Sequence, residues 1–355
     1  MINVLIVEAL SAEQALLIHI LSADAQICVV GIVPDGAAAL DAVRRYQPDV
    51  IVMALHLPKM NGLEVTRRIM ETDPRPIIVM SGNNNPEVTK DTFDAMEVGA
   101  LAVLPRLVGV DHLDHETAVQ ALVQTVKLMS EIKVVRRWPR RLVLPITRAV
   151  DAKLPVAPAR MRIVAIGAST GGPPALHTLL AALPRTFPVP LLIVQHMAVG
   201  FIQGFVDWLG QSSSLPVQMA KQGDRLLAGH IYVAPDGHQM MINHMDRIVL
   251  TQDDPENGLR PSVSYLFRSV NAVYDSTAVA ILLSGMGRDG ADELALLREK
   301  GAITIAQDKA SSVVHGMPGE AIKLDAARYI LPPEEIASVL VKLVSYGGSN
   351  ANGVT

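Results

Sequence analysis

Short apolar runs rich in Val, Ile and Leu alternate with helical stretches along most of this chain of 355 residues. In residues 1–130 five such runs are each followed by a helical pattern, and Pro and Gly separate the units. Strands joined through helices pair in parallel, and the helices then cover both faces of the sheet. We therefore predict a flavodoxin-like (βα)5 domain over residues 1–130. The expected strands are 2–7, 28–33, 49–53, 76–80 and 100–104, and the expected helices are 12–21, 37–46, 62–70, 92–99 and 116–129.

A second alternating region follows, over residues 161–347. Shorter β-like pieces interrupt its rhythm and predict an antiparallel insertion in a doubly wound, mostly parallel α/β domain. The expected strands are 162–167, 190–196, 278–285 and 302–308, the shorter pieces are 231–235, 240–244 and 247–252, and the expected helices are 173–183, 201–209, 261–274, 291–299 and 332–345.

Residues 131–160 are predicted to be a basic, Pro-containing linker. From Glu131 to Arg162 the sequence has four prolines and nine Lys or Arg against two acidic residues, a net charge of +7. Like charges repel and prolines interrupt regular structure, which favours a solvated tether. A docking segment for an acidic partner stays open as the alternative.

The composition excludes several protein classes. A chain that is 50% hydrophobic is too apolar to be mostly disordered, and a net charge of -4 argues against a wholly basic nucleic-acid-binding protein. The lone Cys28 permits no intrachain disulfide. The N-terminus lacks the basic region of a signal peptide, and no apolar run approaches the ~18 residues of a membrane span. We therefore expect a cytoplasmic protein that neither binds nucleic acid nor inserts into a membrane.

The segment Gly167-Ala168-Ser169-Thr170-Gly171-Gly172 lies directly between an expected strand and an expected helix. It matches G-x-S-x-G, in which a serine on a sharp turn lies near backbone N–H groups and the positive end of a helix. By itself this motif is weak evidence. A phosphate-binding loop and a purely structural turn compete with a nucleophile at Ser169.

Two further residues favour the nucleophile. His196 ends the strand expected next, and Asp289 follows the strand expected over 278–285. Because carboxyl ends of parallel strands meet at one edge of a sheet, Ser169, His196 and Asp289 are expected to converge there. A serine needs a base to remove its proton, and an imidazole needs a carboxylate to fix its tautomer, so these residue types suit a catalytic triad.

Several longer segments carry a resemblance to a known family. IGASTGG, QHM, PSVxxLF, SGMGRDG and ASSVVHGMPGEAI resemble the catalytic domain of chemotaxis protein-glutamate methylesterases, the CheB family, which combine a receiver domain, a linker and an esterase domain. LPKMNG, PIIVMSG and EVGA are similar to the receiver half. The resemblance spans nearly the whole chain.

This resemblance implies a serine hydrolase that removes methyl groups from glutamate 5-O-methyl esters on cytoplasmic helices of chemoreceptors. Glutamine deamidation is the implied second activity. Ser169 would be the nucleophile, His196 the base and then the acid, and Asp289 the orienting carboxylate. Thr170 would lie beside the nucleophile, and the Met286 N–H would contribute to the oxyanion hole. No cofactor or metal is implied. The implied partners are methyl-accepting chemoreceptors, with a histidine kinase or another signalling protein at the receiver surface.

The receiver half departs from its family where phosphorylation takes place. Receivers carry two acidic residues after the first strand, an acceptor aspartate after the third, Ser or Thr after the fourth and Lys after the fifth, and the acids bind Mg²⁺. The residues at these positions are Glu8 with Ala9, then Ala54, Ser81 and Arg106. Alanine cannot accept a phosphoryl group, so we predict a pseudo-receiver with no phosphoacceptor.

Two other functions remain to be distinguished from this one. A non-catalytic chemosensory adaptor that keeps the esterase fold would show no labelling of Ser169 by a serine-directed probe. A nucleotide-binding module that uses the Gly-rich turn would bind ATP or NAD tightly.

Overall fold

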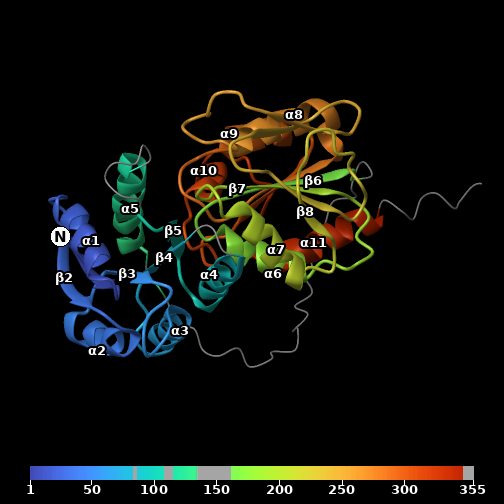
Figure 1. Ribbon diagram of the computed structural model, residues 1–355. Coiled ribbons are helices and arrows are strands. Elements are labelled where there is room, and N and C mark those ends of the chain that lie inside the picture. The colour runs from blue at the N-terminus through green and yellow to red at the C-terminus, as the bar shows by residue number, and fades with distance from the viewer. Residues whose placement is uncertain (83–85, 108–114, 133, 135–160, 347–355) are drawn as a thin grey trace, which may run out of the picture. The chain divides into compact units, whose positions relative to one another are not determined.

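The computed structural model describes residues 1–82, 86–107, 115–132, 134 and 161–346. The chain separates into two compact units, Met1–Arg148 and Ala149–Thr355 (Figure 1). Helix α5 ends at Ser130 and strand β6 begins at Ile163. Nearly all of the predicted linker lies outside the described residues, so its borders at 131 and 160 stay predictions, as does the end of the second domain at 347.

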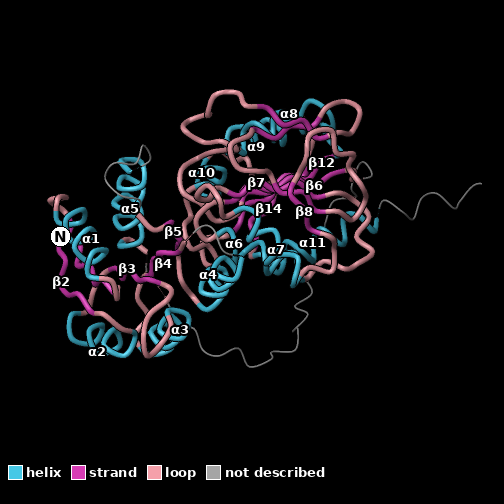
Figure 2. Tube along the Cα trace, in the orientation of Figure 1, coloured by secondary structure: helices cyan, strands magenta, loops and turns pink. Residues whose placement is uncertain are grey.

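The first unit has a five-stranded parallel sheet in the order β2-β1-β3-β4-β5, which is the predicted flavodoxin-like order. Helices α1 and α5 contact each other, and α3 contacts both α2 and α4 (Figures 1 and 2). The strands are β1 (Ile2–Val7), β2 (Ile27–Val33), β3 (Val50–Ala54), β4 (Ile77–Ser81) and β5 (Ala102–Pro105), and the helices are α1 (Ser11–Ser22), α2 (Gly36–Tyr46), α3 (Gly62–Thr72), α4 (Pro86–Val98) and α5 (His115–Ser130).

Local sequence explains these elements. Every residue of β3 is buried, as a continuous apolar run predicts for a central parallel strand. The side chain of Asp35 accepts the N–H of Ala38 at the start of α2, and Asn61 accepts that of Glu64 at the start of α3. Such caps satisfy N–H groups that have no partner within the helix.

The second unit has a seven-stranded parallel sheet in the order β14-β13-β12-β6-β7-β9-β8. Helices α8, α9 and α10 lie on one face and α6, α7 and α11 on the other (Figure 1). The strands are β6 (Ile163–Ala168), β7 (Leu191–Gln195), β8 (Val217–Met219), β9 (Ile231–Val233), β12 (Ala278–Leu282), β13 (Ile303–Gln307) and β14 (Tyr329–Leu331). The helices are α6 (Gly172–Ala181), α7 (Ile202–Ser212), α8 (Val263–Tyr274), α9 (Ala291–Glu299), α10 (Met317–Lys323) and α11 (Pro333–Tyr346), with a 3-10 turn η1 (Asp275–Thr277).

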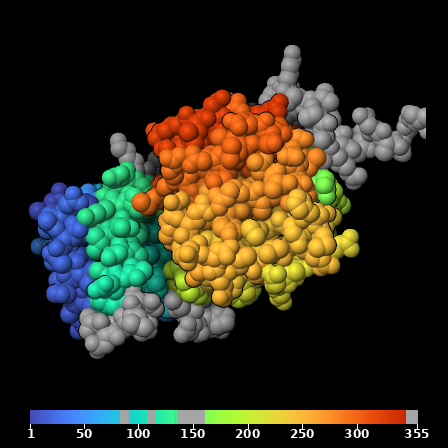
Figure 3. Space-filling view, turned by 90° about the horizontal axis from the view of Figure 1, so that it is seen from above, coloured from blue at the N-terminus to red at the C-terminus, as the bar shows by residue number. Residues whose placement is uncertain are grey.

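The predicted antiparallel insertion is confirmed as a hairpin of β10 (Gln239–Ile242) and β11 (Ile248–Thr251). Three short elements were not predicted, namely β8, β14 and α10. A three-residue strand is too short to show a period, and α10 begins with Met-Pro-Gly, a sequence typical of a turn. Figure 3 shows one face of this unit, formed mainly by its later part, coloured gold to red.

The order of strands positions one edge of this sheet for chemistry. From β6 the chain proceeds to β7 on one side, and it later returns to β12 on the other side of β6. Such a reversal leaves a crevice at the carboxyl ends of the strands, where ligands bind in open α/β sheets. Among the described residues, no helix is both long and apolar enough to cross a membrane.

Candidate active site

Ser169 directly follows β6, on the turn into α6. The close packing around this turn leaves no room for a side chain at the glycines of the motif. A Cβ at Gly167 would lie 2.4 Å from Val263 Cγ1, and one at Gly171 would lie 2.4 Å from Val313 Cβ. Gly171 also has φ +78°, a backbone angle that residues other than glycine adopt rarely. The turn is therefore a tightly packed strand-to-helix turn with the serine at its apex.

Backbone N–H groups are available beside Ser169. Its own N–H donates to the Ser284 carbonyl at 3.0 Å, and Gly285 packs so closely that a Cβ there would lie 2.8 Å from Ser169 Cβ. In the described part of the chain, no hydrogen bond is recorded for the N–H of Thr170 or of Met286. Both groups are thus free to donate to a negatively charged oxygen.

His196 lies next to Ser169 at the end of the adjacent strand. Its backbone N–H donates to the Ala168 carbonyl at 2.9 Å, which extends the pairing of β6 with β7 by one residue. The ring Nε2 lies 2.9 Å from Asp289 Oδ2, so Nδ1 is the ring nitrogen that does not pair with Asp289. Within the described residues no hydrogen bond joins the Ser169 hydroxyl to this ring. Such bonds are often long before substrate binds.

Asp289 lies in the loop between β12 and α9, and its carboxylate caps the N-terminus of α8. Oδ1 accepts the Ser262 hydroxyl at 2.9 Å and the Ser264 N–H at 3.0 Å, while Oδ2 accepts the Val263 N–H at 2.6 Å. Burial alone would raise the pKa of Asp289. Contact with His196, followed by the donors of Ser264, outweighs burial and lowers the pKa to about 2. The carboxylate is therefore ionised throughout the neutral range.

This depressed pKa predicts acid sensitivity of the fold. Asp289 titrates at about 2 when folded and near its ordinary value of 3.8 when unfolded. The stabilisation is therefore complete above pH 3.8 and is lost as the pH falls toward 2. It amounts to about 2 kcal/mol. Urea unfolding of the wild type and of Asp289→Asn at pH 5 and pH 2.5 measures it. The wild type should lose more stability than the variant, and equal losses would contradict the prediction.

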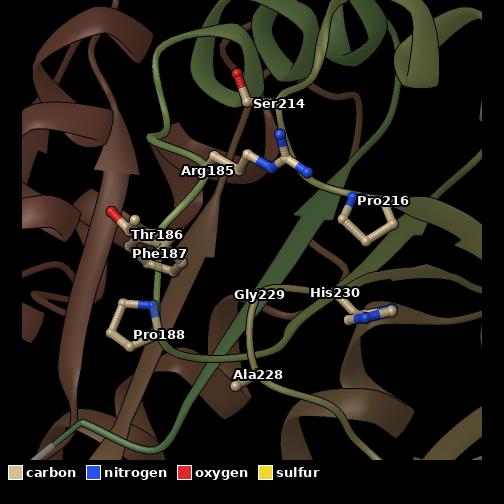
Figure 4. Close-up of a pocket in the computed structure, with 9 residues that line it drawn as sticks. All are labelled: Arg185, Thr186, Phe187, Pro188, Ser214, Pro216, Ala228, Gly229 and His230. Carbon is tan, nitrogen blue, oxygen red and sulfur yellow. The ribbon is translucent and has the colours of Figure 1, made fainter.

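A separate pocket of ≈ 840 Å³ lies among loops before β7, β8 and β9, at the amino ends of the strands. Figure 4 shows its nine lining residues, among them Arg185, Ser214 and His230, and none belongs to the predicted triad. Among the described residues, no group of three or more His, Cys, Asp or Glu side chains is arranged to bind a metal ion.

In the first unit, the carboxyl edge of the sheet carries few oxygen ligands. Ala54 is buried at the end of β3, and Glu8 is 1% exposed after β1. Arg106 lies near both acidic side chains, with Nη2 3.7 Å from Glu8 Oε2 and Nη1 2.6 Å from Glu13 Oε1. Burial, and then the charge of Glu8, raises the pKa of Glu13, while Arg106 opposes this rise.

These residues do not fit a bound Mg²⁺. The ion prefers carboxylates and water in a nearly octahedral arrangement, whereas Ala9 and Ala54 supply no side-chain oxygen. One oxygen of Glu8 already accepts the Leu10 N–H at 2.9 Å, and the other faces the guanidinium of Arg106. The guanidinium of Arg106 therefore lies beside the two carboxylates that could otherwise face a metal ion.

The structure brings together the strand ends that carry Ser169, His196 and Asp289, with Thr170 and the Met286 loop beside them. Their assignment to catalytic roles stays a prediction. Sequence reasoning missed the N-terminus of α8, which surrounds Asp289 with donors. The available signal was Pro261-Ser262 immediately before an amphipathic run, a pattern typical of a helix start.

Comparisons with known proteins agree with this architecture. A family model described as CheB methylesterase matches residues 164–340, and one described as response regulator receiver domain matches residues 4–122. The catalytic domain of Thermotoga maritima CheB methylesterase, a crystal structure, is similar with 34% identity and a TM-score of 0.51. The match covers 52% of this chain and all of that one.

Curated relatives match along the full length. The chain is 56% identical to the protein-glutamate methylesterase/protein-glutamine glutaminase of Nitrosospira multiformis, over 99% of this chain and 100% of that protein. It is 52% identical to protein 4 of the same name from Geobacter metallireducens, over 97% and 99% of the two chains. The chain therefore belongs to the CheB family of protein-glutamate methylesterases/protein-glutamine glutaminases, with a response regulator receiver domain at its N-terminus.

Proposed function

We propose that this protein hydrolyses glutamate 5-O-methyl esters on cytoplasmic helices of chemoreceptors, and deamidates glutamines there, through Ser169, His196 and Asp289. The observation that carries the proposal is the 2.9 Å contact between His196 Nε2 and the buried Asp289 carboxylate, at the strand end next to Ser169. Methanol release from methylated receptor helices, by the wild type and by Ser169→Ala, tests it.

Acylation of the enzyme follows from this geometry. His196 Nδ1 takes the proton of the Ser169 hydroxyl as its oxygen attacks the ester carbonyl, and Asp289 stabilises the imidazolium. The N–H groups of Thr170 and Met286 donate to the negatively charged oxygen of the tetrahedral intermediate. His196 then protonates the departing methoxide, and methanol leaves. For a glutamine substrate, ammonia leaves in the same step.

Deacylation uses the same groups in the second half of the cycle. His196 removes a proton from water, which attacks the acyl-enzyme carbonyl. The same imidazolium then returns the proton to the Ser169 oxygen, and glutamate is released. No metal or cofactor takes part in either step of this proposal.

The second element of the proposal is that phosphorylation of an aspartate does not control this enzyme. Ala54 has no oxygen to accept a phosphoryl group, and Arg106 already pairs with the carboxylates that remain, Glu8 and Glu13. The receiver domain is then a pseudo-receiver that contributes packing or a surface for a signalling partner.

Beryllofluoride, which mimics the phosphoryl group on a receiver aspartate, tests this element. With Mg²⁺ present we expect it to leave the rate of methanol release unchanged, because neither the acceptor nor the metal site is formed. Titration of the full-length protein, with fluorine NMR to detect bound beryllofluoride, is the measurement. A rise in the rate together with a bound-fluoride signal would refute the pseudo-receiver.

A further inference from the structure

Three glutamine side chains are almost completely buried in the second unit. Gln195 is 2% exposed, Gln239 is 0% exposed and Gln307 is 1% exposed. Glutamine is usually found at the surface, so its burial at the end of a strand calls for a physical reason. Gln195 ends β7, Gln239 begins β10 and Gln307 ends β13.

The side chain of Gln195 forms hydrogen bonds with the backbone of both Ser169 and His196. Its Nε2 donates to the Ser169 carbonyl at 2.9 Å and to the His196 carbonyl at 2.8 Å. The Gly172 N–H donates to the same Ser169 carbonyl at 2.8 Å. The ladder between β6 and β7 ends at these residues, so the side-chain amide joins the two backbones just beyond the last pair of the sheet.

Gln239 binds the segment that holds the acid of the triad. Its Oε1 accepts the Ser262 N–H at 2.8 Å, and its Nε2 donates to the Leu259 carbonyl at 3.1 Å. Ser262 in turn donates its hydroxyl to Asp289. The amide therefore fixes the chain that enters α8, whose first N–H groups bind the carboxylate.

Gln307 binds the loop that carries Met286. Its Oε1 accepts the Ser284 N–H at 2.7 Å, and its Nε2 donates to the Ser311 carbonyl at 3.0 Å. The Ser284 hydroxyl donates to the Thr170 carbonyl at 2.8 Å. By holding Ser284, Gln307 thus affects both the turn that carries Ser169 and the loop that carries the Met286 N–H.

We propose that Gln195, Gln239 and Gln307 are positioning residues of the active site. They hold, in that order, the Ser169 and His196 backbones, the start of α8 that binds Asp289, and the loop that carries Met286. A side-chain amide carries donors and an acceptor, like a peptide group, and can continue backbone pairing where a strand has ended. It is also neutral, and so it adds no charge that would disturb His196 or Asp289. The inference rests on the catalytic roles proposed above for Ser169, His196, Asp289 and Met286.

Gln195 has a feature that stability alone does not explain. Its buried Oε1 has no hydrogen-bond partner among the described residues, and it lies where a Cβ on Gly172 would be 2.3 Å away. The amide cannot be reversed, because its oxygen would then face the carbonyls of Ser169 and His196. A buried unpaired acceptor destabilises a fold. The two bonds to catalytic residues supply a functional reason for keeping it.

The test compares full-length variants of Gln195 by the rate at which a fluorophosphonate probe phosphonylates Ser169, with release of fluoride, and by kcat and KM for a methyl ester. Gln195→Met keeps the length of the side chain and removes both donors. We expect kcat to fall about 100-fold with KM nearly unchanged, because small misplacements of reacting groups have effects of this size. The melting temperature should stay within about 4 °C of the wild type.

Gln195→Glu directs carboxylate oxygens at the two carbonyls and should lose more activity than Gln195→Met. Gln203 lies exposed on α7, so Gln203→Glu is the matched control and should keep wild-type rates. Gln307→Met and Gln239→Met should each reduce kcat about 10-fold, because each leaves the hydrogen bonds of Gln195 to the Ser169 and His196 carbonyls intact.

The outcomes separate this inference from the proposed function. If the wild type reacts and the Gln195 variants react equally fast, the positioning role is wrong. A loss of activity that follows the melting temperature across all variants would also overturn it, since that is the behaviour of a merely structural residue. If the wild type itself neither reacts with the probe nor hydrolyses the ester, the proposed triad is wrong instead.

Discussion

Replacing Ser169 by alanine should abolish methanol release from methylated receptor helices, with kcat falling roughly 10⁴-fold or more. Without the hydroxyl, the acyl-enzyme cannot form, and His196 and Asp289 have no nucleophile to activate. Only substrate binding and the N–H groups near Thr170 and Met286 would still stabilise the transition state. This is the largest effect expected of any single substitution in the chain.

The matched control is Ser338→Ala, because Ser338 is exposed on α11 and its hydroxyl donates to the Glu334 carbonyl of the same helix. It should keep the wild-type rate. A fluorophosphonate probe should label the wild type and Ser338→Ala once per chain and leave Ser169→Ala unlabelled. Folded Ser169→Ala that still releases methanol would exclude Ser169 as the nucleophile. A wild type that is folded but never labelled would favour the non-catalytic adaptor.

The sequence predicted that these strand ends meet, because the rules of parallel sheets are strict. Once 163–168, 191–195 and 278–282 are parallel strands, Ser169, His196 and Asp289 must all lie beyond carboxyl ends at one edge. The order β7-β6-β12 makes the three strands neighbours, which periodicity alone could not show. Neighbouring strands bring residues separated by 93 positions, His196 and Asp289, to within 2.9 Å.

What sequence reasoning missed depends on contacts between distant segments. The donors around Asp289 belong to the start of α8, and the chain reaches them only after the whole hairpin of β10 and β11. The buried glutamines appear in the sequence as ordinary polar residues at the borders of apolar runs, as in PLLIVQH and AITIAQD. The role of such a residue can be inferred only when its hydrogen-bond partners are known, because local sequence patterns indicate burial and not hydrogen bonding.

In the receiver half, the function we propose depends on the residue types at a few positions and not on the fold. Its sheet has the flavodoxin-like order, and a receiver model matches it over residues 4–122. The proposed loss of phosphorylation depends only on side chains, above all Ala54 and Arg106. A sheet can preserve the backbone of a site after its chemistry has gone, because packing is supplied by buried strands such as β3.

Replacing Asp289 by asparagine should lower kcat about 10⁴-fold while the chain stays folded at neutral pH. The carboxylate accepts four donors, one of them His196 Nε2–H, and an amide can accept at only one of its two ends. If the new NH₂ group faces His196, it donates to Nε2 and shifts the ring proton to Nδ1. The nitrogen proposed to act as the base then carries a proton and cannot remove another.

If the NH₂ group turns the other way, it meets the N–H of Ser264, and a donor faces a donor in a buried site. Either orientation therefore removes the base or strains the start of α8, and about 5 kcal/mol of transition-state stabilisation is lost. Asp292 is exposed on α9 and pairs with Arg288 in the preceding loop, so Asp292→Asn is the control and should retain wild-type kcat. Activity of Asp289→Asn within tenfold of the wild type would mean that His196 needs no ionised carboxylate to orient it or to stabilise its charged form.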